Sequence, residues 1–160
     1  MDILEYALKM EKDGERFYRG LAGKTTNKSL QTILTMLAQD EQRHYDTIDA
    51  LRAGRSQTAQ TTILDQAKNV FAQMEQSADH LILGADQIAL YKQAQQIERK
   101  SRQFYLDNAA KTSSQPQRLV FEILAAEEDK HYFLLENVIE FIGRPREWLE
   151  NAEWHHLEEY

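Results

Sequence analysis

The chain has 160 residues, a formal net charge of −7, six glycines, two prolines and no cysteine. The lack of cysteine excludes disulfides, thiolate zinc sites and cysteine-ligated iron, so a metal would have to be bound by nitrogen and oxygen. The acidic balance and the absence of a basic stripe argue against nucleic acid as a partner. The length fits one domain with one core, and the scarcity of Gly and Pro favours an all-α fold.

The sequence gives no reason to expect a membrane protein. No stretch approaches the roughly 20 apolar residues that are needed to span a bilayer. Residues 1–15 mix charged and apolar side chains instead of forming the apolar core of a signal peptide. We therefore expect a cytoplasmic protein that does not act at a membrane.

Helical periodicity predicts two long helices in the first third of the chain. Apolar residues recur at helical spacing from about residue 2 to 24 and again to about residue 52. Between them, Thr25, Thr26 and Asn27 interrupt the pattern and offer capping side chains for the second helix. Gly54 is well placed to end that helix. Residues 2–54 are therefore predicted to form a helical hairpin.

Two more long helices are predicted after a connecting segment. Residues 55–84 are polar and Thr-rich at first and read as a crossover that carries one minor helix at about 63–74. Asp86 is predicted to cap a helix that reaches about residue 111, and Pro116 suits the first turn of a helix that ends at Gly143. The predicted division is a bundle over 1–143, made of a hairpin at 2–54, a crossover at 55–84 and a hairpin at 85–143, followed by a docked tail or short helix at 144–160.

An internal repeat sets the architecture. With a shift of 87 residues, positions 7–52 align with positions 94–139 without a gap. Each half is then one helical hairpin, and two hairpins joined by a crossover make a four-helix bundle. The identical pairs include Glu11/Glu98, Tyr18/Tyr105, Glu41/Glu128 and His44/His131.

Both copies of the repeat contain a Glu-x-x-His motif, at Glu41–His44 and at Glu128–His131. Residues three apart share one face of a helix, so the carboxylate and the imidazole can converge on one point. One such motif is weak evidence, because glutamate is common in helices. Two copies at equivalent repeat positions predict a metal site much more strongly.

The spacing from the turns places four glutamates at one level of the bundle. Glu11 and Glu41 are each 15 residues from the middle of the first turn, and Glu98 and Glu128 are each 15 residues from the middle of the second. At 1.5 Å per residue, all four lie roughly 22 Å along their helices. Four carboxylates would balance two divalent ions, and the mixture of oxygen and imidazole suits iron or manganese. The competing interpretation is a solvated charge pattern that both hairpins retained.

This ligand pattern resembles that of the rubrerythrin-type members of the ferritin-like superfamily. The resemblance covers about residues 7–52 and 94–139. It implies two iron ions, with manganese as the alternative metal, and a set of six ligands. Glu11 and Glu98 would each bind one metal as terminal ligands, Glu41 and Glu128 would bridge the two metals, and His44 and His131 would each bind one.

The resemblance implies a non-haem di-iron oxidoreductase that reduces hydrogen peroxide or O₂. Two features differ from the family pattern: the chain lacks a cysteine-rich rubredoxin module, and Ser101 and Arg102 stand where an extra carboxylate is expected. The electron donor is therefore expected to be a separate protein. The alternatives are a ferroxidase or iron-handling protein, and a non-catalytic structural or interaction bundle. The long crossover would permit hairpin exchange between chains, so we expect a homodimer, in which the hairpins can be swapped.

Several residues near the six ligands have two interpretations each. Tyr18 and Tyr105 each follow a ligand glutamate by two helical turns, and could be hydrogen-bond donors, redox-active phenols or simple core residues. Asp40 and Glu127 could accept the second N–H of a bound imidazole across the bundle, or form surface ion pairs. Glu15 could be a movable extra ligand, although a solvent-facing position is the expectation.

Overall fold

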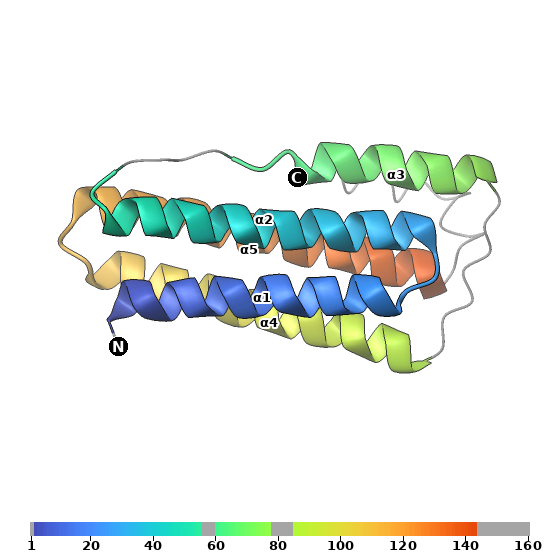
Figure 1. Ribbon diagram of the computed structural model, residues 1–160, viewed down its shortest axis with the longest axis horizontal. Helices are drawn as coiled ribbons and strands as arrows, with labels where there is room; N and C mark the ends of the chain where they lie inside the picture. The colour runs from blue at the N-terminus through green and yellow to red at the C-terminus, as the bar shows by residue number, and fades with distance from the viewer. Residues whose placement is uncertain (1, 56–59, 78–84, 144–160) are drawn as a thin grey trace.

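The computed structural model describes residues 2–55, 60–77 and 85–143, and within these residues it is entirely α-helical. The four long helices run alongside one another, and the shorter helix α3 (Ile63–Ser77) lies along α2 (Lys28–Arg52) on the outside of the bundle (Figure 1). This confirms the predicted all-α, ferritin-like helical bundle. The helices are α1 (Ile3–Lys24), α2 (Lys28–Arg52), α3 (Ile63–Ser77), α4 (Ala85–Lys111) and α5 (Gln115–Gly143).

The first hairpin, α1 and α2, is bounded by the capping residues that the sequence offered. The Asp2 side chain accepts a hydrogen bond from the Glu5 amide at 2.8 Å, and the Asn27 side chain accepts one from the Leu30 amide at 3.0 Å. Gly54 has a φ of +78°, a conformation that glycine adopts at little cost, and it ends α2 as predicted. These boundaries fix the register of the hairpin.

In the second hairpin, residues 112–114 form the turn between α4 and α5, at the positions that the 87-residue repeat aligns with the turn at 25–27. Arg118 closes this turn by donating to the carbonyl of Thr112 at 2.9 Å. Pro116 lies in the first turn of α5, as expected. The predicted start of α4 was slightly wrong, because the helix begins at Ala85 and Asp86 lies inside its first turn instead of capping it.

Helix α3 belongs to the crossover and packs against α2 and α5. Phe71 of α3 is fully buried, and its ring centre lies 5.8 Å from that of Phe141. The predicted minor helix is therefore present, although it extends to Ser77. The predicted tail at 144–160 lies outside the described residues. None of the described helices is long and apolar enough to cross a membrane.

The core consists of two apolar clusters with a polar layer between them. Along α2, for example, Leu37 belongs to one cluster and Ile48 to the other, and Glu41 and His44 lie between them. The same order holds along α1, α4 and α5. Burial of apolar side chains on both sides stabilises the bundle, and it also removes the intervening glutamates from water.

Candidate metal centre

All six predicted ligands meet in the polar layer, and none is more than 4% exposed. Their ligand atoms form two groups of four, and within each group these atoms lie within 4.8 Å of one another. Glu41 and Glu128 belong to both groups. We name the groups the first half-site, formed by Glu11, His44 and the two shared glutamates, and the second half-site, formed by Glu98, His131 and the same shared pair.

The two imidazoles are arranged alike. His44 Nδ1 lies 3.1 Å from Glu128 Oε1 and 3.4 Å from Glu11 Oε2. His131 Nδ1 lies 3.1 Å from Glu41 Oε1 and 3.3 Å from Glu98 Oε1. The rings stack with their centres 5.4 Å apart. Each histidine therefore presents Nδ1 to its own half-site and keeps Nε2 for a partner outside it.

The two terminal carboxylates are each held by a tyrosine from the other hairpin. The Tyr105 hydroxyl donates to Glu11 Oε1, and the Tyr18 hydroxyl donates to Glu98 Oε1. Burial and the adjacent glutamates raise the pKa of both phenols well above its ordinary value, which keeps them protonated as donors. The second oxygen of each carboxylate is buried and has no hydrogen-bond partner among the described residues, as expected of an oxygen that is available to a metal ion.

The titration behaviour indicates that the layer needs positive charge. Burial and the charge of Glu11 raise the pKa of Glu41 well above its ordinary value, and burial and the charge of Glu41 do the same for Glu128. Burial opposes the charge of Glu11, but the neighbouring His44 lowers the pKa of this carboxyl to about 2. Burial disfavours the charged form of His131, yet the carboxylate of Glu98 raises its pKa to about 10. Without metal, protons have to neutralise part of this charge.

The comparisons with known proteins agree with this geometry. A family model described as Rubrerythrin matches residues 2–139. The chain belongs to the rubrerythrin family. This is the ferritin-like di-iron family, in which a buried cluster of carboxylates and histidines is expected to hold metal. No curated protein and no solved structure matches the chain at a significant level.

Outside the ligands of this rubrerythrin-family centre, Asp40 supports the second half-site. Its Oδ2 atom lies 2.9 Å from Nε2 of His131, across the bundle, and Asp40 is only 3% exposed. A carboxylate in this position fixes the orientation of the ring and directs the other nitrogen to the metal. Asp40 also forms an ion pair with Arg43, so both interactions that the sequence suggested for it are present.

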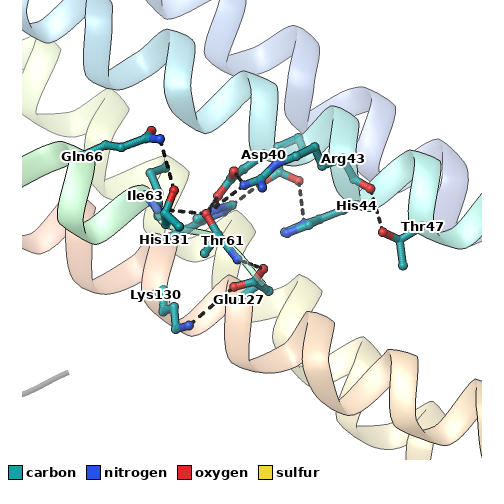
Figure 2. A network of polar contacts seen from close by, with 12 residues as sticks. Asp40, Arg43, His44, Thr47, Thr61, Ile63, Gln66, Glu127, Lys130 and His131 are labelled. Atoms are coloured by element: carbon teal, nitrogen blue, oxygen red, sulfur yellow. Dashed lines mark hydrogen bonds and ion pairs between the residues drawn. The ribbon is translucent and has the colours of Figure 1, made fainter. Parts of the chain in front are cut away.

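Thr61 connects the crossover to this outer layer (Figure 2). Its hydroxyl donates to Asp40 Oδ2 at 2.5 Å, and its amide donates to Glu127 Oε1 at 2.8 Å. The same hydroxyl accepts from Arg43 at 2.9 Å and from the amide of Ile63, the first residue of α3, at 3.1 Å. One residue of the crossover therefore contacts both repeat-related carboxylates. No pattern in the sequence indicated this role for Thr61.

The two half-sites differ in their outer support. Glu127 is the repeat equivalent of Asp40, but its Oε1 atom is occupied by the amide of Thr61, and Lys130 lies 3.7 Å from its Oε2 atom. Nε2 of His44 has no hydrogen-bond partner among the described residues. Of the two roles suggested for these residues, support of an imidazole is present at Asp40, whereas Glu127 has the ion-pair alternative, with Lys130.

Gly14 provides space for the shared Glu41. A Cβ atom at position 14 would lie 3.2 Å from Glu41 Oε2, closer than an ordinary contact. Glycine lowers helix stability by roughly 0.5–1 kcal/mol relative to alanine, so its presence inside α1 has a cost that this close approach explains. An isolated glycine one turn beyond a ligand was a signal in the sequence that could have been recognised.

The expectation that Glu15 faces solvent is wrong. Its side chain is only 10% exposed, so it does not face solvent as predicted. It does not join either half-site, because it is held by Lys12 at 2.8 Å and Arg19 at 3.0 Å. These two cations, with Lys12 the stronger influence, lower the pKa of Glu15 below its ordinary value.

Proposed function

We propose that this protein binds two iron ions, one in each half-site, and reduces hydrogen peroxide or O₂. The observation that carries this proposal is the sharing of Glu41 and Glu128 by two otherwise separate ligand groups. A single ion would leave one histidine and one terminal carboxylate unused. Four carboxylates with neutral histidines also match the charge of two divalent ions, and this oxygen-rich ligand set suits iron or manganese.

The donor atoms fit such a pair of ions. Each half-site offers an imidazole nitrogen, a terminal carboxylate with one unpartnered oxygen, and a carboxylate from each shared residue. The bound metals would supply electrons and Lewis acidity. The chain's own residues would hold the geometry: Tyr105 and Tyr18 orient the terminal carboxylates, and Asp40 orients His131.

Reduction of hydrogen peroxide to two waters consumes two electrons and two protons. As metal ligands Glu41 and Glu128 would be ionised, so the two protons would be supplied by water or by groups outside the ligand set. The electrons that return the metals to the reduced state have to come from a centre outside these 160 residues, because these residues include no cysteine to hold an iron–sulfur or rubredoxin-type donor. We therefore propose a separate donor protein.

Metal analysis of the purified protein tests the binding step. We expect about two iron or manganese ions per chain. Glu41→Ala should lose both ions, because Glu41 belongs to both half-sites, whereas Glu122→Ala, an exposed carboxylate on α5, should retain them. Less than one ion per chain, unaffected by Glu41→Ala, would contradict the proposal.

Stopped-flow mixing of the reduced, iron-loaded protein tests the reaction. Oxidation that is faster with peroxide than with O₂ supports a peroxidase. Oxidation that is faster with O₂, with continued consumption of added Fe(II), would instead identify a ferroxidase. Neither reaction is expected of an interaction bundle, which should also keep its thermal stability on chelation.

A further inference from the structure

An opening between α4 and α5 leads directly to the ligand layer. It has a volume of about 330 Å³, and Glu98 and Glu128, one terminal and one shared ligand, form part of its lining. Both glutamates are only 1% exposed, so they lie at the inner end of the opening. The rest of the lining is polar or amphipathic and includes Arg102, Gln103, Asp129 and Tyr132.

Side chains of α4 and α5 meet along this opening: Arg99 lies over the ring of Tyr132, with 4.6 Å between the guanidinium carbon and the ring centre, and Arg102 faces Asp129. Nε of Arg102 lies 3.9 Å from Oδ1 of Asp129, and both side chains are nearly half exposed. An ion pair of this length and exposure contributes little and exchanges readily with water. Rotation of the Arg102 side chain would widen the opening.

The repeat-related positions on α1 and α2 carry a different set of contacts. Arg102 corresponds to Glu15, and Asp129 corresponds to Gln42. There Lys12 donates to Glu15 at 2.8 Å and to Gln42 at 3.2 Å, so three side chains link the two helices over the ligand layer. The two faces of the duplicated bundle are thus not equivalent, although they derive from the same pattern.

A second cavity, of about 300 Å³, lies beside α1 but does not reach the ligands. Its lining is mainly apolar, with Tyr6, Met10, Phe17 and Ile97, and it includes none of the six ligand residues. Gly14 lies in this lining and separates it from Glu41. Of these two cavities, only the polar one ends at metal ligands.

We propose that the α4–α5 opening is the route by which hydrogen peroxide reaches the metal centre. This inference rests on the proposed function and names its substrate. Hydrogen peroxide is small and uncharged and both donates and accepts hydrogen bonds, so it can exchange its water partners for those of a polar lining. O₂ makes no comparable hydrogen bonds and gains nothing from such a route. The polar lining therefore suits peroxide.

A substitution that obstructs the opening tests the route. Gln103 is exposed at its rim, and its repeat equivalent Arg16 is exposed on the other hairpin. We compare Gln103→Trp with Arg16→Trp, using azide as a small probe of the iron-loaded protein in stopped-flow absorption. Association and dissociation of azide should both slow, on the order of tenfold, in Gln103→Trp only, because an obstructed route changes rates and leaves the dissociation constant unchanged.

Oxidation of the reduced protein by peroxide should slow by a similar factor in the same variant. Arg102→Ala removes the ion pair at the outer end and should have the opposite effect, faster oxidation by peroxide. This second variant tests the route if the tryptophan perturbs folding. Unchanged azide kinetics in Gln103→Trp, or equal slowing in Arg16→Trp, would overturn the proposed route.

The two proposals fail separately. If the unmodified protein does not react with peroxide, but Gln103→Trp slows both association and dissociation of azide, the peroxidase assignment is wrong and the route still serves small ligands. If the unmodified protein reacts rapidly with peroxide and neither tryptophan changes any rate, the function stands and the route is wrong.

Discussion

Thr61 offers the sharpest test of how the crossover supports the metal centre. Thr61→Val keeps the size of the side chain and the backbone amide that donates to Glu127, and it removes the hydroxyl, which donates to Asp40 and accepts from Arg43 and the Ile63 amide. Asp40 in turn orients His131. We therefore expect the second half-site to lose affinity for metal, while the first half-site, whose His44 has no such support among the described residues, is nearly unchanged.

The size of the expected loss of metal affinity in Thr61→Val follows from the contacts of Asp40. A hydrogen bond to a charged group contributes about 1.5–3 kcal/mol, and loss of an outer partner of a metal ligand typically weakens metal binding by about 10–100-fold. Asp40 keeps its ion pair with Arg43 in the variant, so we expect a loss of metal affinity at the lower end of the range of about 10–100-fold. We expect about a tenfold loss in one of two binding steps, which corresponds to about 1.4 kcal/mol.

Titration with cobalt(II), followed by visible absorption and calorimetry, resolves the two steps. Thr61→Ser retains a hydroxyl and should restore the second step, and Thr62→Val, at the exposed neighbouring position, should leave both steps unchanged. Equal weakening of both steps, or failure of serine to restore the second, would show that Thr61 acts only through the general stability of the crossover.

Three further predictions follow from the ligand layer. Gly14→Ala should weaken metal binding, because the added Cβ presses on Glu41. Gly20→Ala, with open space around it, should leave metal binding intact and raise the melting temperature. Equal metal affinity in both variants would contradict this reasoning. Tyr105→Phe should weaken mainly the first half-site and Tyr18→Phe mainly the second, each by roughly 1.5–3 kcal/mol in cobalt titrations, since each removes a hydrogen bond to one terminal carboxylate. Metal binding at pH 7 should release protons, because the pKa of His131 in the metal-free protein is about 10 and the ion replaces that proton. The apparent affinity for metal should therefore rise with pH, and calorimetry in buffers of different ionisation enthalpy should detect the released protons. Binding without proton release would refute the assigned charge state.

The sequence by itself determined the bundle and brought its six candidate ligands together. The 87-residue repeat and the equal distances from the turns specify which residues share a level, because an α-helix has a fixed rise and an antiparallel pair is registered by its turn. Helical spacing also placed Tyr18 and Tyr105 on the ligand face, since two turns keep a residue on the same face, but it left open whether they act as hydrogen-bond donors, redox-active phenols or core residues. Their partners did not, because each phenol reaches the glutamate of the other hairpin.

The differences between the two halves were decided only by the tertiary structure. The repeat pairs Asp40 with Glu127, yet Thr61 enters from the crossover, which has no counterpart in the repeat, and occupies Glu127 while it supports Asp40. Glu15 shows the same effect, because Lys12 and Arg19 hold it in a buried position that periodicity assigned to solvent. Local spacing fixes which residues share a face of a helix, whereas contacts between segments distant in sequence fix which partner each buried polar group finds.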